Sequence, residues 1–301
     1  MSISAASLSH SARHAALGNA IDYAGLFPPA ELSLAEAVAN YRGYRASADA
    51  WALGRFVIPV ARLSELEALL TGEPRDAPSL PLAALLGQDV AEDLRVIEGF
   101  NRRMSQRGAH IESVEARAQS ESDVPAILEA LPGNWQRYIE LPLREGAARA
   151  LDTVAKHRAA AKVRTGGIAL GSFPTPDELL GFLVHTARRG VGFKATAGLH
   201  HPLRGSYRLT YDAAAPRGIM YGFLNLLLAT AVLRLGASVA EAGAALLENQ
   251  ASTISFANGE LRWRKRRFSA ADLADLRHGF FHGFGSCSFR EPLDELAAGG
   301  W

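Results

Sequence analysis

The chain of 301 residues contains one cysteine, Cys287, and few lysines among its 32 basic residues. A single cysteine excludes an intrachain disulfide and a cysteine-rich zinc site. The lack of disulfides fits a reducing environment, so we expect a cytoplasmic protein. Because arginine heavily outnumbers lysine, the few lysines stand out as residues to place in the fold.

Long hydrophobic runs and an excess of one charge are also missing. The longest apolar stretch, residues 219–235, is interrupted by polar side chains, which argues against a membrane span. Residues 1–20 lack the pattern of a signal peptide and predict a short leading helix. The formal net charge of +1 argues against a nucleic-acid surface. We therefore predict a small-molecule partner. Residues 219–235 hint at a homo-oligomer, although burial within the chain explains them equally well.

Short apolar runs alternate with helical patterns along most of the chain. The expected strands are residues 20–26, 54–60, 80–86, 109–116, 137–141, 160–165, 192–197 and 279–284. The expected helices are residues 34–44, 63–70, 90–103, 124–131, 146–156, 176–189 and 220–235, with a terminal helix beginning near residue 291. Eight strands alternating with helices predict an α/β fold of the (β/α)8 TIM-barrel type, with an open doubly wound sheet as the alternative.

No linker divides the chain, so we expect a single domain spanning residues 1–301. One segment, residues 253–267, breaks the alternation with two short strand-like runs around Asn258-Gly259. Asn-Gly between such runs is typical of a tight hairpin turn. We expect this hairpin as an insertion between the seventh and eighth strands.

Two lysines occupy similar positions in consecutive expected strands. Lys162 and Lys194 each lie in an apolar run that ends in glycine, and a helical stretch separates the runs. Parallel neighbours in a β-α-β unit would place both side chains at their carboxyl ends. Because neighbouring ammonium groups repel and burial disfavours charge, we expect one of them to lose its proton near neutral pH. A neutral lysine amine can form a Schiff base with a carbonyl compound. The alternative is a pair of structural lysines.

Acidic residues near the expected strand ends could partner these lysines. Asp22 follows the first strand and is either a proton carrier or a turn former. Glu140, between apolar residues of the fifth strand, is either an acid–base group or a structural ion-pair partner of Lys162 or Arg164. In the fourth strand Glu112 and Glu115 lie on opposite faces, so at most one of them points inward.

The loops after the seventh and eighth strands supply binding candidates. His200 and His201 are adjacent, so their side chains point apart and rarely ligate one ion. We therefore expect no metal and assign both to substrate binding, with Arg204 suited to a phosphate or carboxylate. The Gly285-Ser286 turn precedes the terminal helix and suits an anion, unless it only needs glycine for a tight turn. Cys287 has no neighbouring base in the sequence, so we treat it as a small residue.

Taken in order, four motifs resemble class I aldolases of the deoxyribose-phosphate aldolase type. The segments that carry the resemblance are residues 21–28 (IDYAGLFP), 162–166 (KVRTG), 193–198 (FKATAG) and 284–288 (FGSCS). The strand-five acid of that family resembles Glu140. The likeness is continuous over residues 137–203 and patchy in the first half of the chain.

The resemblance implies that Lys162 forms the imine and that Lys194 lowers its affinity for the proton. It also implies a proton relay through Asp22 and a phosphate at the backbone of Gly198 and Ser286. We count Arg164, Thr165 and Gly285 as further candidates for substrate or phosphate binding, and we expect no cofactor. The chain departs from the family in lacking a clear counterpart of the strand-four aspartate. Arg164 replaces a serine, and Ala197 replaces a glycine. Arg164 and Arg204 favour a different, anionic substrate.

We therefore expect a lyase of carbohydrate or organic-acid metabolism that forms a Schiff base and makes or breaks a carbon–carbon bond. One alternative is an isomerase or hydrolase on the same barrel that uses His200, His201 and an acid. The other is a non-catalytic barrel that binds small anions, which the missing strand-four aspartate favours.

Overall fold

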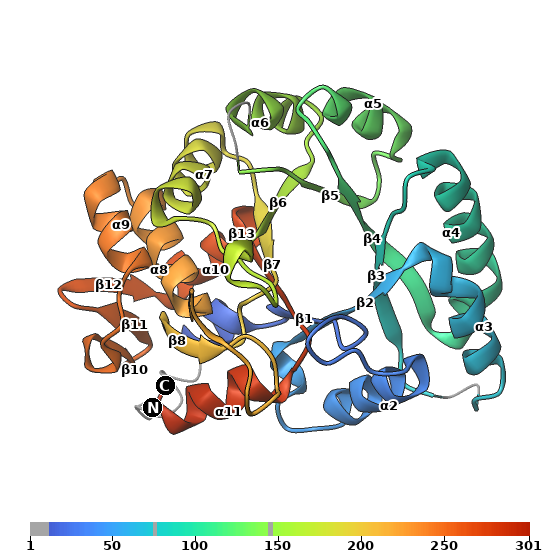
Figure 1. Cartoon of the computed structure of the whole chain (residues 1–301), viewed down its shortest axis with the longest axis horizontal. Helices are drawn as coiled ribbons and strands as arrows, with labels where there is room; N and C mark the ends of the chain where they lie inside the picture. The colour runs from blue at the N-terminus through green and yellow to red at the C-terminus, as the bar shows by residue number, and fades with distance from the viewer. Residues whose placement is uncertain (1–11, 75–76, 144–146) are drawn as a thin grey trace, which may run out of the picture.

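In the computed structural model, which describes residues 12–74, 77–143 and 147–301, eight parallel strands close into a barrel (Figure 1). The strands, in the order in which they follow one another around it, are β1 (Ile21–Tyr23), β2 (Leu53–Pro59), β3 (Leu80–Leu85), β4 (Ala109–Arg117), β5 (Gln136–Glu140), β6 (Ala160–Arg164), β7 (Phe193–Thr196) and β13 (Phe281–Ser286). Because β13 pairs with β1, the sheet has no open edge. The predicted (β/α)8 barrel is confirmed, and the open sheet is wrong.

Helices surround the barrel as the alternation predicts. They are α2 (Leu34–Arg45), α3 (Leu63–Thr71), α4 (Val90–Met104), α5 (Asp123–Ala130), α6 (Ala147–Lys156), α7 (Pro176–Arg189), α8 (Phe223–Arg234), α9 (Val239–Leu246), α10 (Ala270–Gly279) and α11 (Arg290–Ala298). The hydroxyls of Ser33 and Thr175 cap α2 and α7, each in a capping box with a glutamate in the first turn. Residues 12–17 are helical, and the earlier part of the expected leading helix lies outside the described residues.

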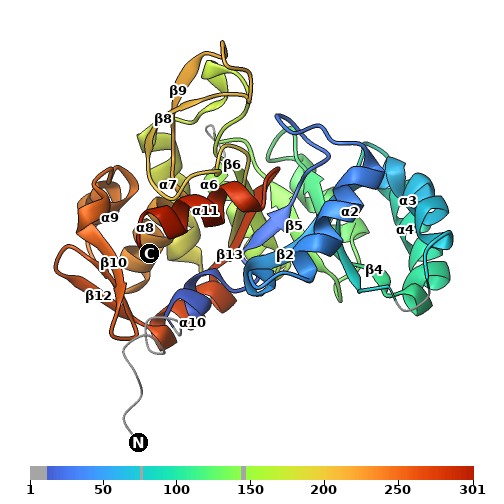
Figure 2. The same ribbon diagram turned by 90° about the horizontal axis from the view of Figure 1, so that it is seen from below.

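The segment before the expected helix at residues 220–235 forms a hairpin that we did not predict. β8 (Gly205–Arg208) pairs antiparallel with β9 (Arg217–Met220), and the two strands project from the barrel as an arm (Figure 2). Residue 220 therefore belongs to a strand. The helix begins after Gly222, where an added Cβ would lie 2.2 Å from the carbonyl oxygen of Pro202. This close backbone approach needs glycine and separates the arm from α8.

α8 explains the longest apolar stretch of the sequence. Its residues from Phe223 to Val232 are all buried, because the helix packs against α7, α9, α10 and β13 of the same chain. The hint of self-association therefore loses its basis. None of the helices in the described ranges is long and apolar enough to cross a membrane.

The insertion before the last barrel strand is larger than the predicted hairpin. β10 (Ile254–Ala257) and β11 (Glu260–Trp263) turn at Asn258 and Gly259, whose φ angles of 54° and 79° are those of the predicted tight turn. β12 (Arg266–Ser269) adds a third strand, so the hairpin is confirmed as part of a three-stranded sheet.

Candidate active site

Lys162 and Lys194 lie side by side on adjacent barrel strands. They are directly paired in the register of β6 and β7, as the β-α-β spacing predicts. Only 5% of the surface of Lys162 and 2% of the surface of Lys194 are exposed to solvent. Two amino groups are thus held together at the carboxyl end of the barrel, where enzymes of this fold carry out their chemistry.

Glu115 of β4 bridges the two lysines. One of its carboxylate oxygens lies 2.7 Å from Lys162 Nζ, and the other lies 2.6 Å from Lys194 Nζ. Lys162 is also 2.9 Å from Glu140 Oε2, and Lys194 donates to Asp22 Oδ2. Three carboxylates and two amino groups therefore form one connected, buried cluster.

Glu115 is the strand-four acid that lies beside the lysines. Glu112 pairs instead with Arg55 at 3.2 Å and with His110 at 2.7 Å. The pairing of β3 with β4 has a register irregularity between Ile111 and Ser113, so the alternation of faces is interrupted at Glu112. The parity argument, which assumed an unbroken alternation from Glu112 to Glu115, therefore does not apply to this strand.

The cluster holds Lys194 in its protonated form. Burial acts to lower the pKa of Lys194, but Asp22 and Glu115 outweigh burial and raise it above its ordinary value. Burial likewise acts to raise the pKa of Glu115, but Lys162 and Lys194 lower it to about 2. Lys194 is therefore a cation at neutral pH, contrary to the loss of a proton that we considered for either lysine.

Asp22 fits into a space that only glycine leaves open. Its Oδ1 accepts a hydrogen bond of 2.7 Å from the backbone N–H of Arg55, and its Oδ2 accepts from Lys194. A Cβ on Gly54 would lie 2.3 Å from Asp22 Oδ1. Asp22 is therefore a positioning residue for the Lys194 ammonium, and Gly54 makes that position accessible.

We expect Gly54→Ala to lower the free energy of unfolding by about 1–3 kcal/mol, because the added methyl group forces Asp22 away from its partners. Urea unfolding measures the change. Gly43→Ala is the matched control, because nothing lies within 4 Å of an added Cβ in that exposed turn of α2. The control variant should be unchanged or slightly more stable. Equal destabilisation of both variants would contradict this role of Gly54.

Glu140 forms ion pairs with both of its predicted partners, Lys162 and Arg164. Its carboxylate contacts Lys162 and lies 3.5 Å from Arg164 Nε. Burial acts to raise the pKa of Glu140, but Lys162 and Arg164 lower it. Glu140 is therefore ionised at neutral pH, which suits a proton acceptor better than a proton donor.

Thr165 donates a 2.6 Å hydrogen bond to Ala197 O, so its hydroxyl connects β6 to the segment after β7.

The cluster opens into a cavity of about 330 Å³. Glu115, Lys162 and Lys194 line it, together with Arg164 and the apolar wall of Phe27, Pro28, Val57, Leu85 and Ile168. Asp22 and Glu140 contact the lysines but are not among the lining residues. A small carbonyl compound entering this cavity would meet the lysines directly. We call it the lysine cavity.

The segments after β7 and β13 meet at His200. This side chain lines the lysine cavity, and its Nδ1 lies 3.3 Å from Glu291 Oε2 of α11 and 3.4 Å from Ser286 Oγ. Burial alone would lower the pKa of His200, but Cys287 and Glu291 raise it to about 10. His200 is therefore a cation at neutral pH. Gly285 and Cys287 also line the cavity.

An acid of the chain lies close to the expected phosphate turn. The Glu291 carboxylate of α11 pairs with His200, which also lies 3.4 Å from Ser286 Oγ of that turn. A phosphate bound at this turn would meet the Glu291 carboxylate, which opposes its binding. Gly198, at φ 72°, approaches Gly166 so closely that its Cβ would lie 3.0 Å from the Gly166 Cα.

His201 and Arg204 do not join the lysine cavity. The His201 ring stacks on Tyr207 at 3.4 Å, and its Nδ1 lies 2.8 Å from Glu295 Oε1. The rings of His200 and His201 lie 6.3 Å apart and pair with different acids, Glu291 and Glu295. Arg204 lines two hollows other than the lysine cavity, and its backbone N–H donates to Asn225 Oδ1.

One group of metal-ligating side chains was not predicted. Among the residues that the structure describes, His201, Glu291 and Glu295 offer atoms that lie within 4.8 Å of one another. The signal was the spacing of the two glutamates by four positions on a helix, which places them on one face. A nitrogen and two carboxylates suit zinc or manganese.

Comparison of the sequence with protein-family models and with curated proteins finds no match.

Proposed function

We propose that the protein is a lyase of the class I aldolase type that forms a Schiff base between Lys162 and a small carbonyl substrate. The observation that supports it best is the bridging of Lys162 and Lys194 by Glu115 at the wall of the lysine cavity. Glu115 supplies the strand-four acid whose absence favoured a non-catalytic barrel. The resemblance to the deoxyribose-phosphate aldolase type agrees with this arrangement.

The neighbours of Lys162 divide the work of a Schiff-base reaction. Lys162 must give up a proton before it attacks a carbonyl carbon, and Glu115 and Glu140 lie within 2.9 Å of its Nζ as acceptors. Lys194 stays charged beside it and opposes its protonation. The opposite arrangement, with Lys194 as the nucleophile, would require a proton to leave an ammonium that Asp22 and Glu115 stabilise.

The bond changes then follow those of imine chemistry. The amine adds to the carbonyl carbon, and loss of water gives a protonated imine. In the cleavage direction, a hydroxyl on the β-carbon, the second carbon from the imine carbon, loses its proton. The bond between the α- and β-carbons breaks, and its electron pair moves through the α-carbon toward the imine nitrogen. An aldehyde leaves and an enamine remains. Protonation of the enamine carbon and hydrolysis release the second product and restore Lys162.

Proton exchange at the carbon next to the carbonyl tests this function. Acetaldehyde, acetone and pyruvate in deuterated water should exchange these protons in the presence of the protein, because an enamine must form and be reprotonated. Proton NMR follows the loss of signal. Lys162→Met should reduce the exchange to the rate without protein, while its unfolding transition shows that it is folded. Equal exchange by the variant would contradict the proposal.

A metal-dependent hydrolase or isomerase is a second candidate function, because His201, Glu291 and Glu295 could together ligate one metal ion. Metal analysis of the purified protein separates the two functions. A bound metal required for turnover, with no enamine exchange, would favour this candidate. Exchange that persists after treatment with a chelator would favour the aldolase-type lyase.

A further inference from the structure

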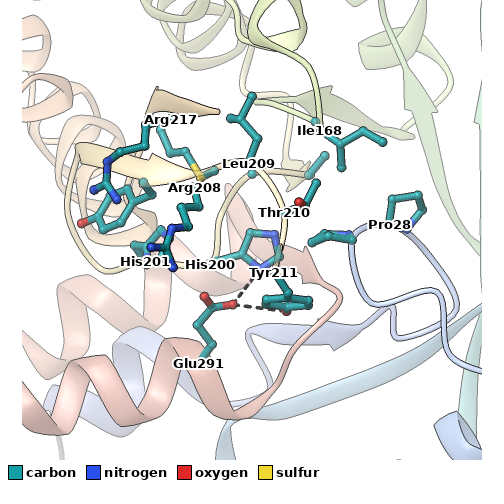
Figure 3. A pocket seen from close by; sticks show the side chains of 16 residues that line it. Pro28, Ile168, His200, His201, Arg208, Leu209, Thr210, Tyr211, Arg217 and Glu291 are labelled. Atoms are coloured by element: carbon teal, nitrogen blue, oxygen red, sulfur yellow. Dashed lines mark hydrogen bonds and ion pairs between the residues drawn. The ribbon is translucent and has the colours of Figure 1, made fainter. Parts of the chain in front are cut away.

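A second compartment adjoins the lysine cavity, and residues of the β8–β9 arm line it (Figure 3). Its volume is about 260 Å³. The residues that line both compartments are Pro28, Gly167, Ile168, Ala197 and His200. A molecule longer than the lysine cavity could therefore extend past His200 into this second space, which we call the arm compartment.

The lining of the arm compartment is positively charged. Arg208 and Arg217 come from the arm, whereas Glu291 is the one carboxylate among the described lining residues. Glu291 is already paired with the His200 cation, and Tyr211 donates to it at 3.5 Å. These interactions appear as dashed lines in Figure 3. Two arginine charges therefore remain without a carboxylate in this lining.

The side chains of Arg208 and Arg217 differ in their hydrogen-bond partners. Arg217 donates to the backbone oxygen and to the hydroxyl of Ser206 within the arm. The Arg208 side chain makes no hydrogen bond or ion pair with any residue in the described ranges. Figure 3 shows it reaching from the arm toward His201 and Glu291. An unpaired guanidinium at the wall of a hollow is suited to bind an incoming oxyanion with two parallel hydrogen bonds.

We infer that the arm compartment binds an oxyanion, a carboxylate or a phosphate monoester, at the far end of a carbonyl substrate, with Arg208 as its anchor. This inference rests on the proposed function and names its substrate class. The carbonyl end lies at Lys162, and the chain of the substrate passes His200 along the apolar surface of Pro28, Ile168 and Leu209. The anion is thus recognised by the arm and not by the turn before α11, where Glu291 would oppose it.

Matched aldehydes test this assignment. One set ends in a carboxylate, a second in a phosphate monoester and a third in a neutral hydroxyl, each at several chain lengths. Borohydride trapping on Lys162 gives the concentration that half-saturates the protein. The charged probe of the right length should half-saturate at a concentration about tenfold or more below its neutral partner, because hydrogen bonds to a charged group add that much affinity. The set with the larger advantage identifies the anion.

Arg208→Gln should remove the advantage of the charged probe. Arg164→Gln is the matched control, since Arg164 is the arginine that lines the lysine cavity itself. If Arg164→Gln and not Arg208→Gln removes the advantage, the anion binds beside the carbonyl and the inference is wrong. Half-saturation of the wild-type protein at equal concentrations of charged and neutral probes would also overturn the inference. As long as the aldehydes are trapped on Lys162, this result would not contradict the proposed function.

Calorimetry tests the arm compartment without any imine. Glutarate and inorganic phosphate should bind the wild-type protein, and at least one of them should lose its binding in Arg208→Gln. Absent binding, or binding that Arg208→Gln leaves unchanged, would overturn the inference. Failure of every aldehyde to be trapped would instead reject the proposed function.

Discussion

Glu115→Gln should destabilise the protein more than any other single change in the cluster, by about 3–5 kcal/mol at neutral pH. The amide has one oxygen to accept a hydrogen bond, and its N–H₂ group would face an ammonium that also donates. The variant therefore loses at least one of the contacts that Glu115 makes with Lys162 and Lys194. The imine should also form much more slowly, because an acceptor beside Lys162 is gone. Urea unfolding and borohydride trapping measure the two effects.

This loss of stability should depend on pH in one direction. The pKa of Glu115 is lowered from 4.5 to about 2 in the folded protein. A carboxyl whose folded pKa is depressed stabilises the protein fully above its unfolded pKa, and its contribution is lost as the pH falls through the folded pKa. The difference between wild type and Glu115→Gln should therefore be constant near neutral pH and shrink between pH 4.5 and 2.

Glu112→Gln is the control on the same strand. Its ion pairs with Arg55 and His110 lie at the surface, with 39% of the Glu112 side chain exposed. We expect this variant to change stability by no more than about 1 kcal/mol. A Glu115→Gln variant that is as stable as Glu112→Gln, or whose deficit does not shrink in acid, would show that the buried bridge is not held as the structure has it.

Lys194→Met should make imine trapping at Lys162 require more alkaline solution. The substitution removes a cation beside Lys162 and leaves Asp22 and Glu115 without their ammonium partner, and both changes favour a proton on Lys162. We expect the pH of half-maximal trapping to rise by about one to three units, which is the usual effect of one neighbouring charge. At neutral pH the trapping rate should fall tenfold or more in consequence.

Lys265→Met provides the matched control, because Lys265 is exposed and lies far along the chain in the turn between β11 and β12. Its pH profile should coincide with that of the wild-type protein. An unchanged midpoint in a folded Lys194→Met variant would mean that Lys194 does not set the reactivity of its neighbour. Adducts on Lys194 in the wild-type protein would reverse the roles of the two lysines.

The barrel and the pairing of the two lysines could both be predicted, because they depend on local sequence patterns. Alternating strand and helix periods fix the order of elements, and a β-α-β unit fixes the parallel register of Lys162 and Lys194. The arm at 205–220 was not predicted, since its strands are short and half-exposed and merge with the apolar α8 segment. The start of α8 depends on a contact between Gly222 and Pro202, which the sequence pattern does not contain.

The partners of the lysines could be predicted only in part. Asp22 and Glu140 are acids in apolar runs, which is a local signal. The parity of β4 could not choose between Glu112 and Glu115, because the register irregularity at Glu112 interrupts the alternation of faces and leaves no mark in the sequence. The meeting of His200 with Glu291, and of His201 with Glu295, joins segments about ninety residues apart. No spacing rule reports such a contact.

Imine trapping on Lys162 tests the central claim most directly. The protein is treated with borohydride in the presence of small aldehydes, ketones and 2-oxo acids, and peptide mass spectrometry locates the adducts. We expect a stable adduct on Lys162 that is absent in Lys162→Met and unchanged in the exposed controls Lys156→Met and Lys265→Met. No adduct on Lys162 from any carbonyl compound, with the protein folded, would contradict a Schiff-base lyase.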